Sequence, residues 1–241
     1  MTDKQKQRLI ERWLNVAAWF VALLFFFPIF WLFLTSFKTE LQAIAVPPLL
    51  FFEPTLENYT LIQERTDYTG YALSSVITSF GGTALALLIA IPSAYAMAFK
   101  PGRFTKDILL WMLSTKMLPA AAVLYPMTFL TKNFLGIFDT HFLVIMVLSL
   151  INLPIVIWML FTYFKEIPKE IIEAGKMDGA GIWGEIREIV LPLAWGGLAS
   201  TALLCFIFCW NEAYWTVRLT TTDAATLSKL IEGNRAPEGL F

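Results

Sequence analysis

Five long apolar segments constrain this 241-residue chain more than any other feature of its sequence. A bilayer core about 30 Å thick requires roughly 20 apolar residues of helix. Five segments reach that length, and Lys116 is the only charged residue inside them: Trp13 to Phe37, Tyr68 to Phe99, Ile108 to Thr131, Phe142 to Phe164 and Ile189 to Asn211. Since 57% of the residues are hydrophobic and 15% are charged, we predict an all-α, polytopic bundle of five transmembrane helices.

The charge balance and the cysteines exclude several other classes of protein. A net charge of −1 provides no basic field for nucleic acid. Cys205 and Cys209 lie four residues apart in an apolar run, where we expect small packing residues and neither a disulfide framework nor a metal site. The polar, basic start from Thr2 to Arg12 is not followed by a small-residue cleavage site, which predicts a retained signal-anchor helix.

The basic residues of the connecting segments predict the orientation. Eleven lysines and arginines lie in the N-terminal tail and in the second and fourth connections, and six lie in the others. Because basic loops remain in the cytoplasm, the N-terminus and the fourth connection are expected to be cytoplasmic.

A charged, glycine-containing segment, residues 165–192, separates the fourth and fifth apolar runs. Pro168 suits the first position of a helix, and Gly175 and Gly179 are places where a helix can end. We therefore predict a short exposed helix from about Pro168 to Met177. Its docking face, laid against a groove of another protein, would contain Ile167, Ile171 and Ala174 or Gly175.

A second helical piece should follow, from Ile182 to Pro192. Its apolar residues recur at helical spacing, and its charged residues fall on the other side: Glu185, Arg187 and Glu188. Such an amphipathic piece is expected to lie along the membrane surface until Pro192 restarts the chain.

The spacing within residues 165–192 resembles a known signature. Glu173-Ala174-Gly175, then Gly179, then Ile189-x-Leu191-Pro192 is similar to the cytoplasmic loop of inner-membrane permease subunits of binding-protein-dependent ABC importers, with Gly175 in place of an alanine. The resemblance implies a type I importer permease core over residues 71–241, preceded by a tail, helix and periplasmic loop over 1–70. It also implies that the loop meets an ATPase through five residues: Glu173, Ala174, Gly175, Asp178 and Gly179.

Other stretches resemble the carbohydrate members of this family. They are Pro54 to Tyr59, Asp139-Thr140 and Trp210-Asn211-Glu212, and the pattern from Asn211 to Thr216 looks closest to sorbitol and mannitol permeases. Each also has a plainer interpretation, namely a surface turn into an interfacial helix, a helix cap, and an aromatic belt with a capped helix end. A permease for amino acids or another solute, and a truncated membrane protein without transport activity, remain the alternatives.

Five residues are candidates for the substrate path: Lys116, Asn152, Trp210, Asn211 and Glu212. A lysine inside a span faces water or a partner, or else its chain bends toward the headgroups, and both alternatives are open for Lys116. Asn152 with Pro154 indicates a weakened helix at mid-membrane depth, where transporters often bind substrate. The aromatic and polar groups from Trp210 to Glu212 suit sugar rings and hydroxyls.

A stripe of small residues predicts close helix packing in the second span. Gly82, Ala86, Ala90, Ala94 and Ala98 recur every four residues, so another helix can approach closely, either in this chain or in a second permease.

The partners follow from what the chain lacks and from the resemblance. No Gly-x4-Gly-Lys-Ser/Thr loop is present, so we expect a permease without its own ATPase and without a bound cofactor. The resemblance implies two ATP-binding subunits, a homologous second permease, a soluble solute-binding protein and an inner-membrane location. It also implies a sixth helix, which Pro237 to Phe241 would approach, so a truncated chain is expected.

Overall fold

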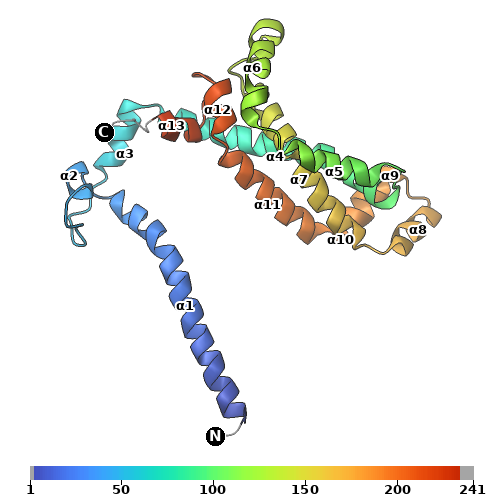
Figure 1. Cartoon of the computed structure of the whole chain (residues 1–241), viewed down its shortest axis with the longest axis horizontal. Coiled ribbons are helices and arrows are strands. Elements are labelled where there is room, and N and C mark those ends of the chain that lie inside the picture. The colour runs from blue at the N-terminus through green and yellow to red at the C-terminus, as the bar shows by residue number, and fades with distance from the viewer. Residues whose placement is uncertain (1–2, 234–241) are drawn as a thin grey trace. The chain divides into compact units, whose positions relative to one another are not determined.

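The computed structural model describes the backbone of residues 3–233 and the side chains from Ile10 onward. Throughout this range the secondary structure is helical, and no strand is present in it, which confirms the predicted all-α class (Figure 1). The chain forms two compact units, Met1–Tyr68 and Thr69–Phe241. The expected approach to a sixth helix at Pro237 to Phe241 lies outside the described residues.

The first unit consists of one long helix and two short ones, α1 (Asp3–Thr35), α2 (Glu40–Ala43) and α3 (Glu57–Arg65). From Ile10 to Thr35, α1 is long and apolar enough to cross a membrane, and its most apolar window is entirely unburied in the chain. This confirms the first predicted apolar helix. A helix with so many large apolar side chains is not expected to face water, which fits a membrane span.

A buried lysine holds the loop after α1. Lys38 is only 2% exposed; its Nζ lies 4.4 Å from the centroid of the Trp31 ring and donates a hydrogen bond of 2.8 Å to the Leu49 carbonyl. The Asn58 amide donates to the carbonyls of Ser36 and Lys38 at 3.1 and 2.6 Å. The stretch from Pro54 to Tyr59 is therefore a turn into α3 that is fastened to the end of α1.

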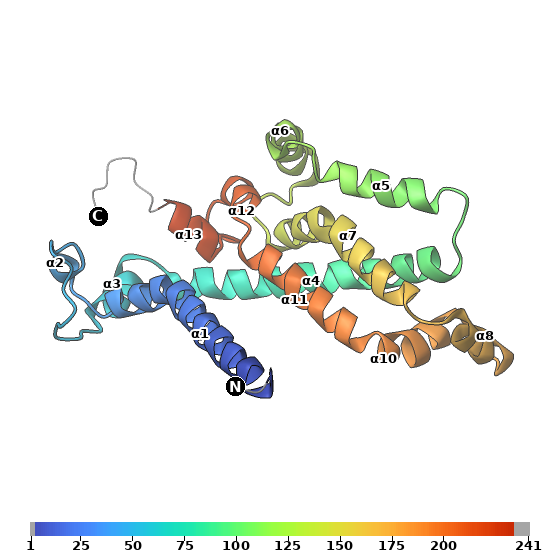
Figure 2. The ribbon, with the colours of Figure 1, turned by 60° about the horizontal axis from the view of Figure 1, so that its bottom comes forward.

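Three helices form the centre of the second unit: α4 (Tyr68–Phe99), α7 (His141–Lys165) and α11 (Trp195–Trp210). Figure 2 shows them side by side. Both α4 and α7 meet the length and apolarity of a membrane span, as predicted, and they run unbroken through Pro92 and Pro154. The weakening of α7 that we expected at Asn152 and Pro154 therefore does not extend to a break in the helix.

The small-residue stripe of α4 packs within this chain. Ala86, Ala90 and Ala94 are completely buried. A Cβ atom on Gly82 would lie 3.2 Å from Leu148 Cβ of α7 and 3.3 Å from Cys209 Sγ of α11, so any larger side chain would push these helices apart. Cys205 and Cys209 are buried in the core of this unit, as expected of small packing residues.

The third predicted span is not one straight helix, which corrects our expectation for Ile108 to Thr131. The helix α5 (Thr105–Thr115) is followed by α6 (Ala120–Leu130) and the π-helical turn η1 (Thr131–Leu135), with a bend of 87° between α5 and the α6–η1 segment. Pro119 precedes α6 and has an extended backbone. Proline has no N–H to donate and disfavours helix in the residue before it, so the chain turns here.

The fifth predicted span is also bent. The short helices α9 (Ile182–Gly184), η2 (Glu185–Val190) and α10 (Leu191–Leu193) form one segment, and α11 leaves it at 86° after Ala194. We predicted a separate helical piece that ends at Pro192. The piece is present, but the bend lies at Ala194, two residues later. With both bent pairs counted as single spans, residues 3–233 contain up to five spans by length and composition.

Candidate functional site

The charged loop places α8 (Lys169–Met177) at one end of the second unit, and α12 (Tyr214–Leu219) and α13 (Leu227–Gly233) lie toward the other end (Figures 1 and 2). The bounds of α8 confirm the predicted helix, and Pro168 occupies the capping position immediately before α8. A hydrophobic contact holds α8 on η2, because Ile172 is 1% exposed and belongs to the same core cluster as Ile186 and Val190.

The predicted docking face of α8 was partly wrong. Ile171 is 40% exposed, as a docking residue should be, but Ile167 is buried in the chain's own core. Ile172, which we had not placed on a contact face, anchors the helix instead. Consecutive isoleucines point about 100° apart on a helix, and the position of η2 decides which of them is covered.

Two glycines permit the shape of this loop. A Cβ atom on Gly175 would lie 2.3 Å from Cδ1 of Ile189, so alanine at this position would require the end of the Ile189 side chain to move. Gly179 has a φ of +87°, a left-handed conformation that glycine adopts without strain. Of the two predicted places for the helix to end, α8 continues through Gly175 and ends at Met177, just before the turn at Gly179.

The outer surface of α8 is available to another protein. Glu173, Ala174 and Asp178 are exposed, Met177 is 88% exposed, and Trp183 of the neighbouring α9 is 72% exposed. Two acidic groups beside large apolar side chains form a mixed surface of the kind that protein interfaces bury. Four of the five predicted coupling residues are exposed here, and Gly175 alone is partly covered.

A buried carboxylate connects the loop to α4. Glu185 was expected on the polar side of its helical piece, but it is 2% exposed and accepts a hydrogen bond from the Tyr95 hydroxyl. The π-helical geometry of η2 changes the angle between successive side chains, so the 3.6-residue period used for the prediction did not apply. A tyrosine beside the small-residue stripe of α4 was the only sequence signal for a polar partner.

Lys116 and Asn152 lie together, although they are 36 residues apart in the sequence. Lys116 occupies the bend between α5 and α6, and its Nζ donates a hydrogen bond of 3.3 Å to Oδ1 of Asn152. Asn152 is 3% exposed, and its amide also donates to the Leu148 carbonyl at 3.0 Å. Since Lys116 points at a buried amide, the lining interpretation is favoured over a side chain bent toward the headgroups.

A cavity of about 400 Å³ lies beside this pair. Lys116, Pro154, Glu212 and Trp215 are among its lining residues. It therefore combines a cation, a carboxylate and aromatic and apolar walls, which suit a polar organic ligand.

Trp210 and Asn211 do not line this cavity, although both were predicted path residues. The Trp210 carbonyl accepts a hydrogen bond from Ser228, and the Asn211 amide donates to the Ile207 carbonyl. Glu212 does line the cavity, but its Oε1 also accepts a hydrogen bond of 3.1 Å from the Trp215 backbone N–H. The helix-end interpretation thus accounts for most of this stretch.

Asp139 organises a distant loop, which the sequence analysis missed. We call residues 220–226 the anchored loop. The Asp139 carboxylate accepts backbone hydrogen bonds from Thr221, Thr222, Asp223 and Ala224 at 2.8 to 3.3 Å, and another from the Thr221 hydroxyl. Burial raises the pKa of Asp139, but these hydrogen bonds outweigh it and hold the pKa well below its ordinary value.

Thr140, which follows Asp139, caps a helix, as its plainer interpretation predicted. The Thr140 hydroxyl accepts a hydrogen bond of 3.2 Å from the Leu143 N–H and caps α7. His141 Nε2 lies 3.0 Å from Ser74 Oγ, so this histidine has a polar partner at the end of α4. For the anchored loop, the three consecutive threonines 220–222 were the one sequence signal of a turn rich in hydrogen-bond donors, which the Asp139 carboxylate could bind.

Sequence comparison identifies relatives over most of the chain. The Probable ABC transporter permease protein y4oR of Sinorhizobium fredii is 30% identical over 91% of this chain and 79% of its own length. The Inner membrane ABC transporter permease protein YcjP of Escherichia coli is 32% identical over 88% and 75% of the two chains. The Trehalose/maltose transport system permease protein MalG of Thermococcus litoralis is 31% identical over 88% and 76%.

Structural comparison supports the same fold. A bacterial ABC transporter involved in the import of the acidic polysaccharide alginate has a chain that superposes with a TM-score of 0.75 at 22% identity, over 94% of this chain and 79% of that one. Residues 86–238 match the family described as binding-protein-dependent transport system inner membrane component. The chain therefore belongs to this family of inner-membrane permease components.

Proposed function

We propose that this chain is a permease subunit of an ATP-driven importer that takes up a carbohydrate delivered by a solute-binding protein. The observation that carries the proposal is the exposed helix α8, which presents Glu173 and Ala174 while Gly175 and Gly179 shape its attachment. Relatives with named substrates point to sugars, since they include permeases for diacetylchitobiose, trehalose and maltose.

In this proposal, force enters through α8. Two ATP-binding subunits close on ATP and move α8. Ile172 holds α8 on η2, and the hydrogen bond from Tyr95 to Glu185 holds η2 on α4. A rigid helix that is held at several points transmits a displacement to the segments it contacts. A homologous second permease would complete the transport pathway across the membrane. The chain then alternates between outward-open and inward-open arrangements.

Lys116 and Glu212 are the proposed contacts for substrate, and Asn152 is proposed to position Lys116. A cationic donor and a carboxylate acceptor line the cavity and can exchange hydrogen bonds with hydroxyls of one ligand, while the buried Asn152 amide accepts a hydrogen bond from Lys116. Within the carbohydrates, we propose a polyol of the sorbitol or mannitol kind, on the basis of the pattern from Asn211 to Thr216.

Co-purification and uptake test this function. Tagged chain extracted in mild detergent should bring down an ATP-binding subunit and a second permease. Cells that express the whole system should accumulate radiolabelled sorbitol or mannitol, and unlabelled trehalose and maltose show how strictly polyols are selected. Isolation of the chain without an ATP-binding subunit, together with no uptake of any carbohydrate, would contradict the proposal.

Replacement of Lys116 tests the cavity. Lys116→Ala should lower uptake roughly tenfold or more at unchanged membrane abundance, because it removes the cationic hydrogen-bond donor that lines the cavity and is proposed to contact substrate. Lys132→Ala is the matched control, since Lys132 is an exposed lysine outside this cavity. A fall in abundance that matches the fall in uptake would instead assign Lys116 a structural role.

A further inference from the structure

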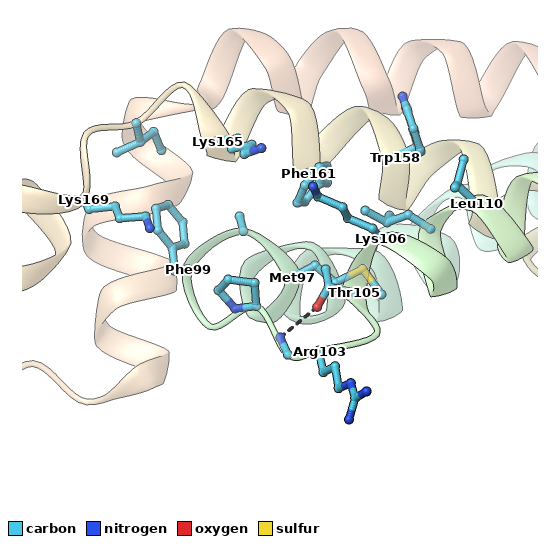
Figure 3. A pocket seen from close by; sticks show the side chains of 15 residues that line it. Met97, Phe99, Arg103, Thr105, Lys106, Leu110, Trp158, Phe161, Lys165 and Lys169 are labelled. Atoms are coloured by element: carbon cyan, nitrogen blue, oxygen red, sulfur yellow. Dashed lines mark hydrogen bonds between the residues drawn. The ribbon is translucent and has the colours of Figure 1, made fainter.

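A second and larger cavity lies near the end of the unit where α8 is attached. It has a volume of about 670 Å³ and lies between the end of α4, the start of α5 and the end of α7 (Figure 3). We call it the basic pocket. Its walls are mainly apolar and include Met97, Phe99, Leu109, Trp158 and Phe161. None of the proposed substrate contacts lines it.

Four cationic side chains line the basic pocket, and no acidic side chain does: Arg103, Lys106, Lys165 and Lys169. In Figure 3, Arg103 points away from Lys106, Lys165 and Lys169. The Lys165 Nζ lies 5.6 Å from the centroid of the Phe161 ring. Three ammonium groups around one cavity create a positive potential that favours an anion.

The apolar walls determine what kind of anion fits. A small soluble anion would leave the surfaces of Met97, Trp158 and Phe161 uncovered, whereas an amphiphile covers them with hydrocarbon. Lys165 ends α7, Lys169 begins α8, and Lys106 lies in the first turn of α5. Since α4 and α7 are membrane spans, their ends lie at headgroup depth. Basic pockets between transmembrane helices recognise anionic lipid headgroups in this way.

We propose that the basic pocket binds one anionic phospholipid, with its phosphate at Lys106, Lys165 and Lys169 and its acyl chains along Trp158 and Phe161. Lys169 is the first residue of α8, so the bound lipid supports the base of the coupling helix. The proposal rests on the proposed function in one respect, because it takes the α8 end to be the cytoplasmic end.

Native mass spectrometry of the assembled importer tests lipid binding directly. The complex is released from nanodiscs that contain dioleoylphosphatidylglycerol or dioleoylphosphatidylcholine, and bound lipids are counted per chain. The test variant is Lys106→Gln with Lys165→Gln, and the control is Lys132→Gln with Arg218→Gln, which removes two exposed cations that do not line the pocket. Loss of two lysines should weaken phosphatidylglycerol binding roughly 30-fold, and the control should bind as the wild type does.

Any one of four results would overturn the lipid site. The first is equal retention of phosphatidylglycerol by the wild type and the test variant. The second is equal retention of phosphatidylcholine and phosphatidylglycerol by the wild type. The third is full displacement of the lipid by millimolar glycerol phosphate, which would indicate a site for a soluble anion. Weakening by the control variant to the same degree would show only general surface attraction, and would also reject the site. Because the measurement needs neither ATP nor transported solute, its outcome is independent of whether uptake is observed.

Discussion

Replacement of Glu173 by lysine is expected to abolish uptake while the protein still inserts into the membrane. Glu173 is exposed on α8, so its side chain does not stabilise the core, and reversal of its charge should leave folding intact. If Glu173 is the charged contact to the ATP-binding subunit, the reversal replaces attraction by repulsion in a buried interface. Such losses weaken association roughly 30-fold or more.

The measurements are membrane abundance, co-purification of the ATP-binding subunit, ATP hydrolysis and uptake of labelled substrate. Abundance should not change, uptake should fall to background, and hydrolysis should no longer respond to substrate-loaded binding protein. Glu170→Lys is the matched control, because Glu170 is also exposed on α8 and the change in charge is the same. Normal uptake by Glu173→Lys would reject the docking role of this residue.

Asp139→Ala is expected to release the anchored loop. The carboxylate is the common acceptor for the backbone N–H groups of residues 221–224, and alanine leaves all of them without it. Each hydrogen bond to a charged group contributes about 1.5–3 kcal/mol to the free energy of unfolding, and solvent at this half-exposed site reduces that value. Amide hydrogen exchange at Thr221 and Thr222 should therefore accelerate roughly tenfold or more, with little change in the core of α7.

Asp223→Ala provides the comparison for this loop. Asp223 is exposed, and its side chain accepts a hydrogen bond of 3.2 Å from the Thr222 hydroxyl. The same loss of charge in the same loop should therefore leave the exchange rates nearly unchanged. Equal acceleration in both variants would mean that net charge, and not the Asp139 hydrogen bonds, orders the loop.

The pH dependence of the anchored loop has a definite sign. The pKa of Asp139 is lowered on folding, so its stabilising contribution is complete above the ordinary value of 3.8 and is lost progressively as the pH falls below it. Exchange protection at Thr221 should persist through neutral and mildly acidic solution and decline only at stronger acidity. A decline between pH 5 and 7 would contradict this assignment.

The sequence predicted the features that depend on local pattern. Apolar length predicted the helices α1, α4 and α7, and a four-residue repeat predicted the close packing of α4. Proline and glycine predicted the bounds of α8 and the turn at Gly179. Each of these follows from neighbouring residues, because helix length, capping and backbone conformation are local properties.

Only the tertiary structure decided the features that join distant segments. One span was predicted from Ile108 to Thr131, and the 87° bend between α5 and α6 was not evident from the apolar pattern of this stretch. Glu185 and Ile172 are buried because η2 and α4 lie where they do, and a helical period cannot tell which side a neighbour covers. The bond between Lys116 and Asn152 spans 36 positions, and Asp139 reaches 82 residues to Thr221. Contacts across such separations depend on the whole packing arrangement, so no local pattern of residues encodes them.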